Sequence, residues 1–230
     1  MRGIYYYSMI QIYPSILENN INIFKNRLQQ YITLFDYFQI DIADGIFVNN
    51  RTIQIEQLME HGTWNMEHGN QIKNKAFEMH LIVKDWQAEI PKIDRLSKLI
   101  NIKLILIHLQ NFNVTCSMLN ASYAYGIVLN PEDDVEKNIE LIKQFPVCQL
   151  MTIHPGRQGN PFIPEVLDKI EQLRKLSYKG KILLDGAIND KTMPIVLSKK
   201  YLPDAVCPGS YFHDNPKEKL TRLQEIIKMR

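Results

Sequence analysis

The chain has 230 residues, of which 45% are hydrophobic, 10% aromatic and 23% charged. These fractions are typical of globular proteins and exclude disordered, collagen-like and coiled-coil chains. The formal net charge is only +2, so neither nucleic acid nor an anionic membrane is expected as the main partner.

The cysteines indicate free thiols. Cys116, Cys148 and Cys207 lie far apart and form no C-x-x-C motif, which argues against a disulfide framework. The first residues lack the apolar core of a signal peptide, and no window approaches the roughly 18 apolar residues that span a bilayer. We therefore expect a cytoplasmic protein.

Short apolar runs rich in β-branched and aromatic residues recur along the chain and predict strands. In chain order they are Met9–Tyr13, Tyr37–Ile42, Phe77–Val83, Leu104–Leu109, Tyr123–Leu129, Gln149–Ile153, Lys181–Leu184 and Ala205–Cys207. Segments with helical spacing lie between them. The clearest are Pro164–Leu176, which carries one apolar stripe, Val135–Lys143, which follows two acidic residues, and a final helix after Asn215-Pro216.

Eight such runs alternating with helical segments, without a linker or charge block, predict an α/β protein with a (β/α)8 barrel of the TIM type. An open doubly wound sheet gives the same alternation and stays an alternative at this point. Two segments, 50–75 and 111–122, fit the alternation less well than the others.

In such a barrel the catalytic residues lie at the carboxyl ends of the strands, where this chain has Asp41, His80, His108 and Asp185. Apolar neighbours place both aspartates inward. Two carboxylates that face each other across the barrel mouth suit removal and return of a proton on opposite faces of a carbon. Together with His80 they also form a reasonable group for a divalent metal. Each residue alone has an ordinary structural explanation, and only the combination favours a site.

Glycine-containing turns follow the last three predicted strands, at 156–159, 186–187 and 209–210. Barrels commonly bind phosphate at such turns, because glycine lets backbone N–H groups approach the oxygen atoms closely. The turns therefore predict a phosphate-binding side of the barrel mouth.

These segments resemble, in order, the motifs of the ribulose-phosphate 3-epimerase family, which includes allulose-6-phosphate 3-epimerases. QIDIADGIFVNN (39–50) is similar to the family's H-x-D-x-M-D-G-x-F-V-P-N, and EMHLIV (78–83) to its D-x-H-L-M-V. The others are YPSIL (13–17), LIHL (106–109), IVLNPED (127–133), MTIHPGRQGNPFIPEVLDKI (151–170), LLDGAIND (183–190) and VCPGSYF (206–212).

The resemblance implies a ribulose-phosphate-binding (β/α)8 barrel that occupies residues 1–230 as one domain. It implies epimerisation at C3 of a ketose phosphate, D-ribulose 5-phosphate to D-xylulose 5-phosphate or an analogue such as D-allulose 6-phosphate. Asp41 and Asp185 would transfer the protons through an enediolate, and a divalent metal of the Zn, Fe, Mn or Co type would assist. The implied substrate-binding residues are Ser15, His80, Met151, Gly156, Arg157, Gly159, Gly186, Ala187, Gly209 and Ser210. The family likeness also suggests a homo-oligomer.

The departures from the family pattern concentrate at the metal site. Gln39 replaces the first metal-binding histidine, which leaves Asp41, His80 and Asp185 as ligands and Gln39 as a poor fourth. We therefore expect weaker metal affinity, a harder ion or no metal. Two shielding methionines are replaced by Ala43 and Ile82, while Met151 remains.

Other departures affect the loops. Arg157 stands in the glycine-rich turn and could add a phosphate contact. His154 is unusual there, and we expect it at the rim rather than acting as a base. An alternative function is a diverged, non-catalytic sugar-phosphate-binding barrel. The related decarboxylases carry an Asp-x-Lys-x-x-Asp motif, which is disfavoured because no lysine lies between Asp41 and Asp44.

Overall fold

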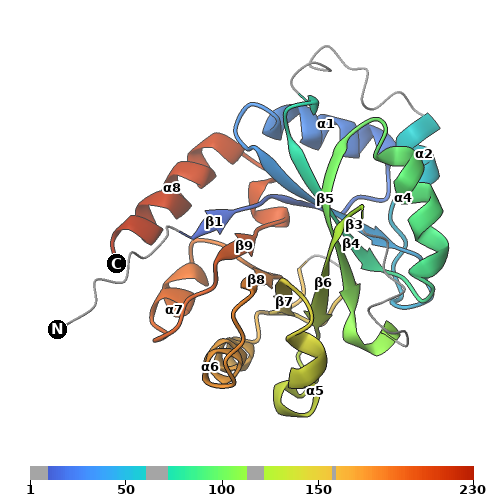
Figure 1. Ribbon diagram of the computed structural model, residues 1–230. Helices are drawn as coiled ribbons and strands as arrows, with labels where there is room; N and C mark the ends of the chain where they lie inside the picture. The colour runs from blue at the N-terminus through green and yellow to red at the C-terminus, as the bar shows by residue number, and fades with distance from the viewer. Residues whose placement is uncertain (1–9, 61–71, 113–121, 157–158) are drawn as a thin grey trace.

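The structure, a computed structural model, describes residues 10–60, 72–112, 122–156 and 159–230. Within them all paired strands are parallel and form one sheet that curls into a barrel, with the helices outside (Figure 1). The strands are β1 (Gln11–Ile12), β2 (Ser15–Ile16), β3 (Tyr37–Ala43), β4 (Ala76–Ile82), β5 (Asn101–His108), β6 (Ala124–Leu129), β7 (Val147–Met151), β8 (Lys181–Asp185) and β9 (Ala205–Cys207).

The barrel closes at residues 11–16, which pair with the sheet on both sides. On one side β1 pairs with β9, and the pairing continues through a hydrogen bond of 3.0 Å from the backbone N–H of Ser15 to the carbonyl of Pro208. On the other side β2 pairs with β3, with Ser15 in register with Gln39. This closure confirms the predicted (β/α)8 barrel and excludes the open doubly wound sheet.

The helices cover the outside of the barrel (Figure 1). They are α1 (Ile21–Tyr31), α2 (Ile55–Glu60), α4 (Ile90–Leu96), α5 (Val135–Ile142), α6 (Asp168–Lys175), α7 (Met193–Leu197) and α8 (Pro216–Lys228), with 3-10 turns at Gln87–Glu89, Leu109–Asn111, Pro164–Leu167 and Ser210–Phe212. The local sequence explains where several of these helices begin. Asn20 caps α1 and Asp134 caps α5 through side-chain oxygens, and Pro216 lies in the first turn of α8.

Two apolar layers result from the alternation of side chains along the strands. The larger cluster contains buried residues of both strands and helices, such as Ile40, Ile105 and Leu223. A smaller cluster comes mainly from the strands, including Leu106, Val128 and Leu183, with Tyr13 and Ala187 packed against it. Among the described residues, the interior of the barrel is thus packed with side chains.

Each predicted strand overlaps an observed one, but some ends differ: β5 begins at Asn101 rather than Leu104, and β7 is Val147–Met151 rather than Gln149–Ile153. The largest difference is at the first strand. The run Met9–Tyr13 was expected to be one strand, but the structure has two short ones, β1 and β2, with Tyr13 and Pro14 between them. Pro14 has no N–H and cannot donate to a neighbouring strand, which interrupts the ladder there. Met9 lies outside the described residues.

The predicted helix at Pro164–Leu176 is also modified. It begins as a 3-10 turn, Pro164–Leu167, and becomes α-helical only in α6. Its first turn has no side-chain cap, and the tighter hydrogen bonding of a 3-10 turn is common at such an end. The predicted helices near 135–143 and after Asn215-Pro216 are confirmed as α5 and α8.

The irregular segments 50–75 and 111–122 are described only in part, since residues 61–71 and 113–121 lie outside the described ranges. Within the described ranges no helix combines the length and apolar character that crossing a bilayer requires.

Cys148 and Cys207 are buried free thiols, as expected, and Cys116 lies outside the described ranges.

Candidate active site

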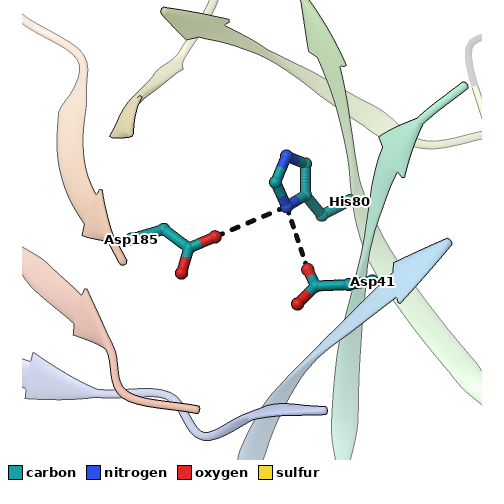
Figure 2. Close-up of side chains that lie close together, drawn as sticks. All are labelled: Asp41, His80 and Asp185. Atoms are coloured by element: carbon teal, nitrogen blue, oxygen red, sulfur yellow. Dashed lines mark hydrogen bonds and ion pairs between the residues drawn. The ribbon is translucent and has the colours of Figure 1, made fainter. Parts of the chain in front are cut away.

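Asp41, His80 and Asp185 come together at the carboxyl ends of β3, β4 and β8 (Figure 2). Nδ1 of His80 lies 2.9 Å from Oδ1 of Asp41 and 3.5 Å from Oδ2 of Asp185. All three residues are buried, and their ligand atoms lie within 4.8 Å of one another. The chain thus forms the Asp-His-Asp group predicted from the strand ends.

The strand register explains this convergence. Asp41 is paired directly with His80 across β3 and β4, so their side chains leave the sheet side by side. Asp185 is paired with Met151 on one side and with Cys207 on the other. All these side chains therefore point to the same face of the curled sheet.

Burial and charge set the protonation of the group. Burial is the largest influence on His80 and lowers its pKa, but hydrogen bonds to the Asp185 and Asp41 carboxylates outweigh it and raise the pKa to about 9. Burial raises the pKa of the Asp185 carboxyl, the His80 hydrogen bond opposes this, and the charge of Asp41 adds to the rise. An acid with a raised pKa is suited to returning a proton near neutral pH.

Gln39 occupies the place of a further ligand. Its Nε2 donates to Oδ1 of Asp41 at 2.8 Å and to Oδ2 of Asp185 at 2.9 Å, and it lies 3.4 Å from Nδ1 of His80. Such separations are similar to those between neighbouring ligands around a small ion, roughly 3 Å for an octahedron with bonds of about 2.1 Å.

Oε1 of Gln39 is buried, with no partner among the described residues. Half a turn of the amide exchanges Oε1 with Nε2, because the two ends have nearly the same shape. The residues therefore fit a divalent ion, with two carboxylates, one imidazole and an amide oxygen as donors. This oxygen-rich set suits Mg²⁺ or Mn²⁺ better than Zn²⁺.

A second glutamine supports the same group. Nε2 of Gln149, on β7, lies 3.2 Å from Oδ2 of Asp185 and 3.5 Å from Nδ1 of His80. Its Oε1 is also buried without a partner among the described residues. Two amide nitrogens thus face the Asp185 carboxylate in this arrangement.

A cavity of about 310 Å³ opens at the mouth of the barrel. Both aspartates line it. So do eight other predicted residues, Ser15, Met151, Gly156, Gly159, Gly186, Ala187, Gly209 and Ser210. Gln39 and His80 are fully buried and are not among the lining residues. Arg157 lies outside the described residues. The cavity thus joins the predicted acid/base pair to the predicted phosphate turns.

The turn after β8 has a conformation suited to binding an anion. Gly186 and Ala187 have φ angles of +113° and +51°. Their backbone N–H groups, and those of Gly209 and Ser210, have no hydrogen-bond acceptor within the described part of the chain. Consecutive unpaired N–H groups in such turns form anion-binding concavities. Lys191 adds a cationic side chain to the cavity lining.

Thr152 holds this turn in place. Its backbone N–H donates to the carbonyl of Asp185 at 2.7 Å, and its hydroxyl lies 3.0 Å from the same carbonyl. The hydroxyl is also 2.5 Å from the carbonyl of Gly186. The loop after β7 therefore fixes the backbone that carries both Asp185 and the glycine turn.

Two residues of the site, Gln149 and Thr152, were not predicted from the sequence. Gln149 precedes Met151 by two positions, as Gln39 precedes Asp41 and Glu78 precedes His80. A polar residue two positions before an inward-facing one on a strand faces inward too, and this alternation could have identified Gln149. Thr152 faces away from that set and gave no such signal.

Two polar residues near the strand ends have structural roles. The Asp44 carboxylate accepts hydrogen bonds from the backbone N–H groups of Ile46, Phe47 and Lys84, and so closes a turn. His154 is exposed and pairs with Glu132 at 2.7 Å, which agrees with the expected place at the rim.

The chain is similar in sequence to one family of known proteins. The sequence model described as "Ribulose-phosphate 3 epimerase family" matches residues 11–211. A ribulose-phosphate 3-epimerase of Bacillus subtilis (strain 168) is 27% identical over 199 residues, covering 82% of this chain and 86% of the relative. One of Helicobacter pylori (strain J99) is 26% identical over 219 residues, covering 92% and 94%.

The fold is shared with more distant solved structures. A structure of KGPDC from Streptococcus mutans superposes with a TM-score of 0.64 at 8% identity, covering 96% of this chain and 99% of that one. The 3-hexulose-6-phosphate synthase from Salmonella typhimurium gives 0.60 at 12% identity, with the same coverage. At such identity these structures show the fold alone. The match across most of the sequence shows that the chain belongs to the ribulose-phosphate 3 epimerase family.

Proposed function

We propose that this protein is a metal-assisted 3-epimerase of ketose phosphates. It interconverts D-ribulose 5-phosphate and D-xylulose 5-phosphate, or a close analogue such as D-allulose 6-phosphate. The observation that carries the proposal is that Asp41 and Asp185 line one cavity, with His80 between their carboxylates. Family membership supports sugar-phosphate epimerase chemistry, and the names of the relatives indicate the pentose phosphate.

The phosphate end of the substrate binds at the glycine turns. The N–H groups of Gly186, Ala187, Gly209 and Ser210 supply hydrogen bonds, and Lys191 supplies positive charge. This arrangement needs no basic surface, which agrees with a net charge of only +2. Binding at the phosphate directs the carbon skeleton toward the aspartates.

Asp41 and Asp185 transfer the protons. One aspartate removes the C3 proton, which the neighbouring carbonyl acidifies, and the other returns a proton to the opposite face. Ser15 positions Asp41, because its hydroxyl donates to Oδ2 of Asp41 at 2.5 Å. Met151 and Ile82 line the cavity beside them and limit access of water to the enediolate.

Asp41, His80 and Asp185, with the amide oxygen of Gln39, would hold the divalent ion. When bound, the ion supplies the positive charge that stabilises the oxyanion of the enediolate. The surrounding residues keep the Asp41 and Asp185 carboxylates at the wall of one cavity and hold the substrate beside them.

Solvent deuterium exchange tests the proposal. Each epimer is incubated in D₂O with Mn²⁺-loaded protein, and deuterium at C3 is followed by NMR for wild type, Asp41→Asn and Asp185→Asn. We expect both single variants to lose interconversion by a factor of about 10²–10⁴. Each variant should still incorporate deuterium at C3 of one epimer. The epimer that is labelled should differ between the two variants.

Asp36→Asn is the control. It removes an exposed carboxylate that pairs with Lys75 on the outside of the barrel, and should exchange like wild type. Absence of exchange with every divalent ion tried (Mg, Mn, Fe, Co and Zn), together with tight ribulose 5-phosphate binding, would contradict the proposal. That outcome would instead support the non-catalytic sugar-phosphate-binding barrel.

A further inference from the structure

A chain of polar side chains runs from the rim of the barrel to the back of His80. Nε2 of His80 lies 2.9 Å from Nε2 of His108, and Nδ1 of His108 lies 3.0 Å from Oδ1 of Asn130. Nδ2 of Asn130 donates to Oε1 of Gln110 at 3.1 Å. Nε2 of Gln110 donates to both oxygens of Asp133, at 2.9 and 3.0 Å.

These residues come from neighbouring elements. His108 ends β5 and Gln110 lies in the 3-10 turn that follows, while Asn130 follows β6 and Asp133 precedes α5. His80 and His108 are fully buried and Asn130 is 7% exposed, whereas Gln110 is at the surface. The chain thus connects the half-buried carboxylate of Asp133 to the interior of the barrel.

The chain has a direction that Asp133 determines. An ionised carboxylate can only accept hydrogen bonds, so Gln110 must present its nitrogen to Asp133 and its oxygen to Asn130. Asn130 must then present its nitrogen to Gln110 and its oxygen to His108. The opposite orientation of both amides would place the Gln110 oxygen against the Asp133 carboxylate, two acceptors without a proton between them.

We propose that Asp133, acting through Gln110, Asn130 and His108, keeps a proton on Nε2 of His80 and so keeps Nδ1 of His80 directed at Asp41 and Asp185. Because Oδ1 of Asn130 accepts, His108 carries its proton on Nδ1 and has a lone pair at Nε2. His80 must therefore donate from Nε2. Asp133 is thus a positioning residue for the metal-binding group, and this role rests on the function proposed above.

Two further contacts hold Asp133 in place. The backbone N–H of Asn130 donates to Oδ2 of Asp133 at 2.7 Å. The ammonium group of Lys169 donates to the backbone carbonyls of Asn130 and Asp133. These contacts hold both Asn130 and Asp133 in the loop between β6 and α5. The Asp133 carboxylate therefore stays beside Gln110.

The wild-type tautomers provide the first test. In metal-free protein labelled with ¹⁵N-histidine, a long-range ¹H–¹⁵N correlation spectrum reports which ring nitrogen carries the proton. We expect His108 to be protonated at Nδ1 only and His80 to carry a proton at Nε2. A proton on Nε2 of His108 would overturn the proposal, whether or not any variant folds.

Asp133→Asn provides the second test. An amide at position 133 can donate as well as accept, so the chain loses its direction. We expect the His108 signal to show a mixture of tautomers, and Mn²⁺ affinity, measured by calorimetry, to fall by about 10- to 100-fold. The control Glu132→Gln removes a charge one position away, where the carboxylate pairs with the exposed His154 and with no other side chain of the described residues.

The control should keep the wild-type tautomer and an Mn²⁺ affinity within about twofold of wild type. Equal losses in both variants would show a general charge effect and overturn the proposal, as would an unchanged His108 tautomer in Asp133→Asn. The outcome is separable from that of the proposed function. Missing turnover with the expected His108 tautomer contradicts only the epimerase, and the opposite His108 tautomer in an active enzyme contradicts only the role of Asp133.

Discussion

Gln39 and Asp185 lie 146 positions apart in the chain, and Nε2 of Gln39 donates to Oδ2 of Asp185 at 2.9 Å. The same nitrogen donates to Asp41 at 2.8 Å, so one amide bridges the two carboxylates. Two carboxylates held close together otherwise repel each other in a buried site. The glutamine therefore stabilises the pair in the metal-free protein and also leaves an oxygen that can turn toward an ion.

The first prediction concerns Gln39→His. An imidazole is a better ligand for zinc than an amide, so Zn²⁺ affinity should rise by about tenfold or more, with a smaller gain for Mn²⁺. Competition with a chromogenic chelator measures both affinities. Gln39→Leu is the matched control, since it removes the amide without adding a ligand, and should lose Mn²⁺ affinity. Equal Zn²⁺ affinity in wild type and Gln39→His would show that position 39 does not reach the ion.

The second prediction concerns Ser15→Ala. The hydroxyl donates to the Asp41 carboxylate, and a hydrogen bond to a charged group is worth about 1.5–3 kcal/mol. Its loss should lower kcat by about 10- to 100-fold and change KM little, as steady-state kinetics would show. Ser198→Ala is the control, because Ser198 is an exposed residue whose hydroxyl donates to the backbone of α7. A rise in KM with unchanged kcat would contradict a role for Ser15 in positioning Asp41.

The third prediction concerns Gly186→Ala. At Gly186 φ is +113°, and a Cβ would lie 2.5 Å from Cγ1 of Ile153. The backbone strain and the clash together should lower the free energy of unfolding by about 2–4 kcal/mol, measured by urea denaturation. Gly159→Ala is a matched control, since φ is +89° there but no atom of the described residues beyond its chain neighbours lies within 4 Å of the added Cβ. Equal losses in both variants would show that contact with Ile153 is unimportant.

The fourth prediction concerns the pH dependence of stability. Burial raises the pKa of Glu78 from 4.5 to about 8. Between these values the unfolded chain has lost the proton and the folded protein keeps it, so this group makes stability fall as pH rises, by up to ~1.4 kcal/mol per pH unit. Glu78→Gln removes this dependence. The Tm of Glu78→Gln minus the Tm of wild type should therefore be several degrees larger at pH 8 than at pH 5.

The Tm comparison uses metal-free protein, because an ion bound at His80 would add its own dependence on pH. His80, with a pKa raised to about 9, also loses stabilising charge as pH rises. This contribution is present in both proteins, so the difference in Tm at each pH reports mainly on Glu78. Glu165→Gln, at an exposed position, should follow wild type at every pH. A constant difference between Glu78→Gln and wild type from pH 5 to 8 would mean that Glu78 is not protonated in the fold.

The sequence predicted the barrel and the Asp41–His80–Asp185 group because strand alternation is a local signal and the strand ends of a barrel meet at one mouth. The inward place of Gln149 was missed, although the alternation that places Met151 inward also places Gln149 inward. Asp133 gave no such signal. Its role depends on contacts with Gln110 and Asn130 that a loop sequence does not encode.

The closure of the barrel at residues 11–16 has a consequence for biosynthesis. Ser15 is made early, but the carbonyl that binds its backbone N–H belongs to Pro208. Such a contact between distant parts of a chain forms slowly, because a long loop must close first. Ser15 can pair early with β3 on one side, but its second side is paired only after residue 208 has left the ribosome. The onset of catalysis during synthesis would report this closure rather than the formation of individual strands.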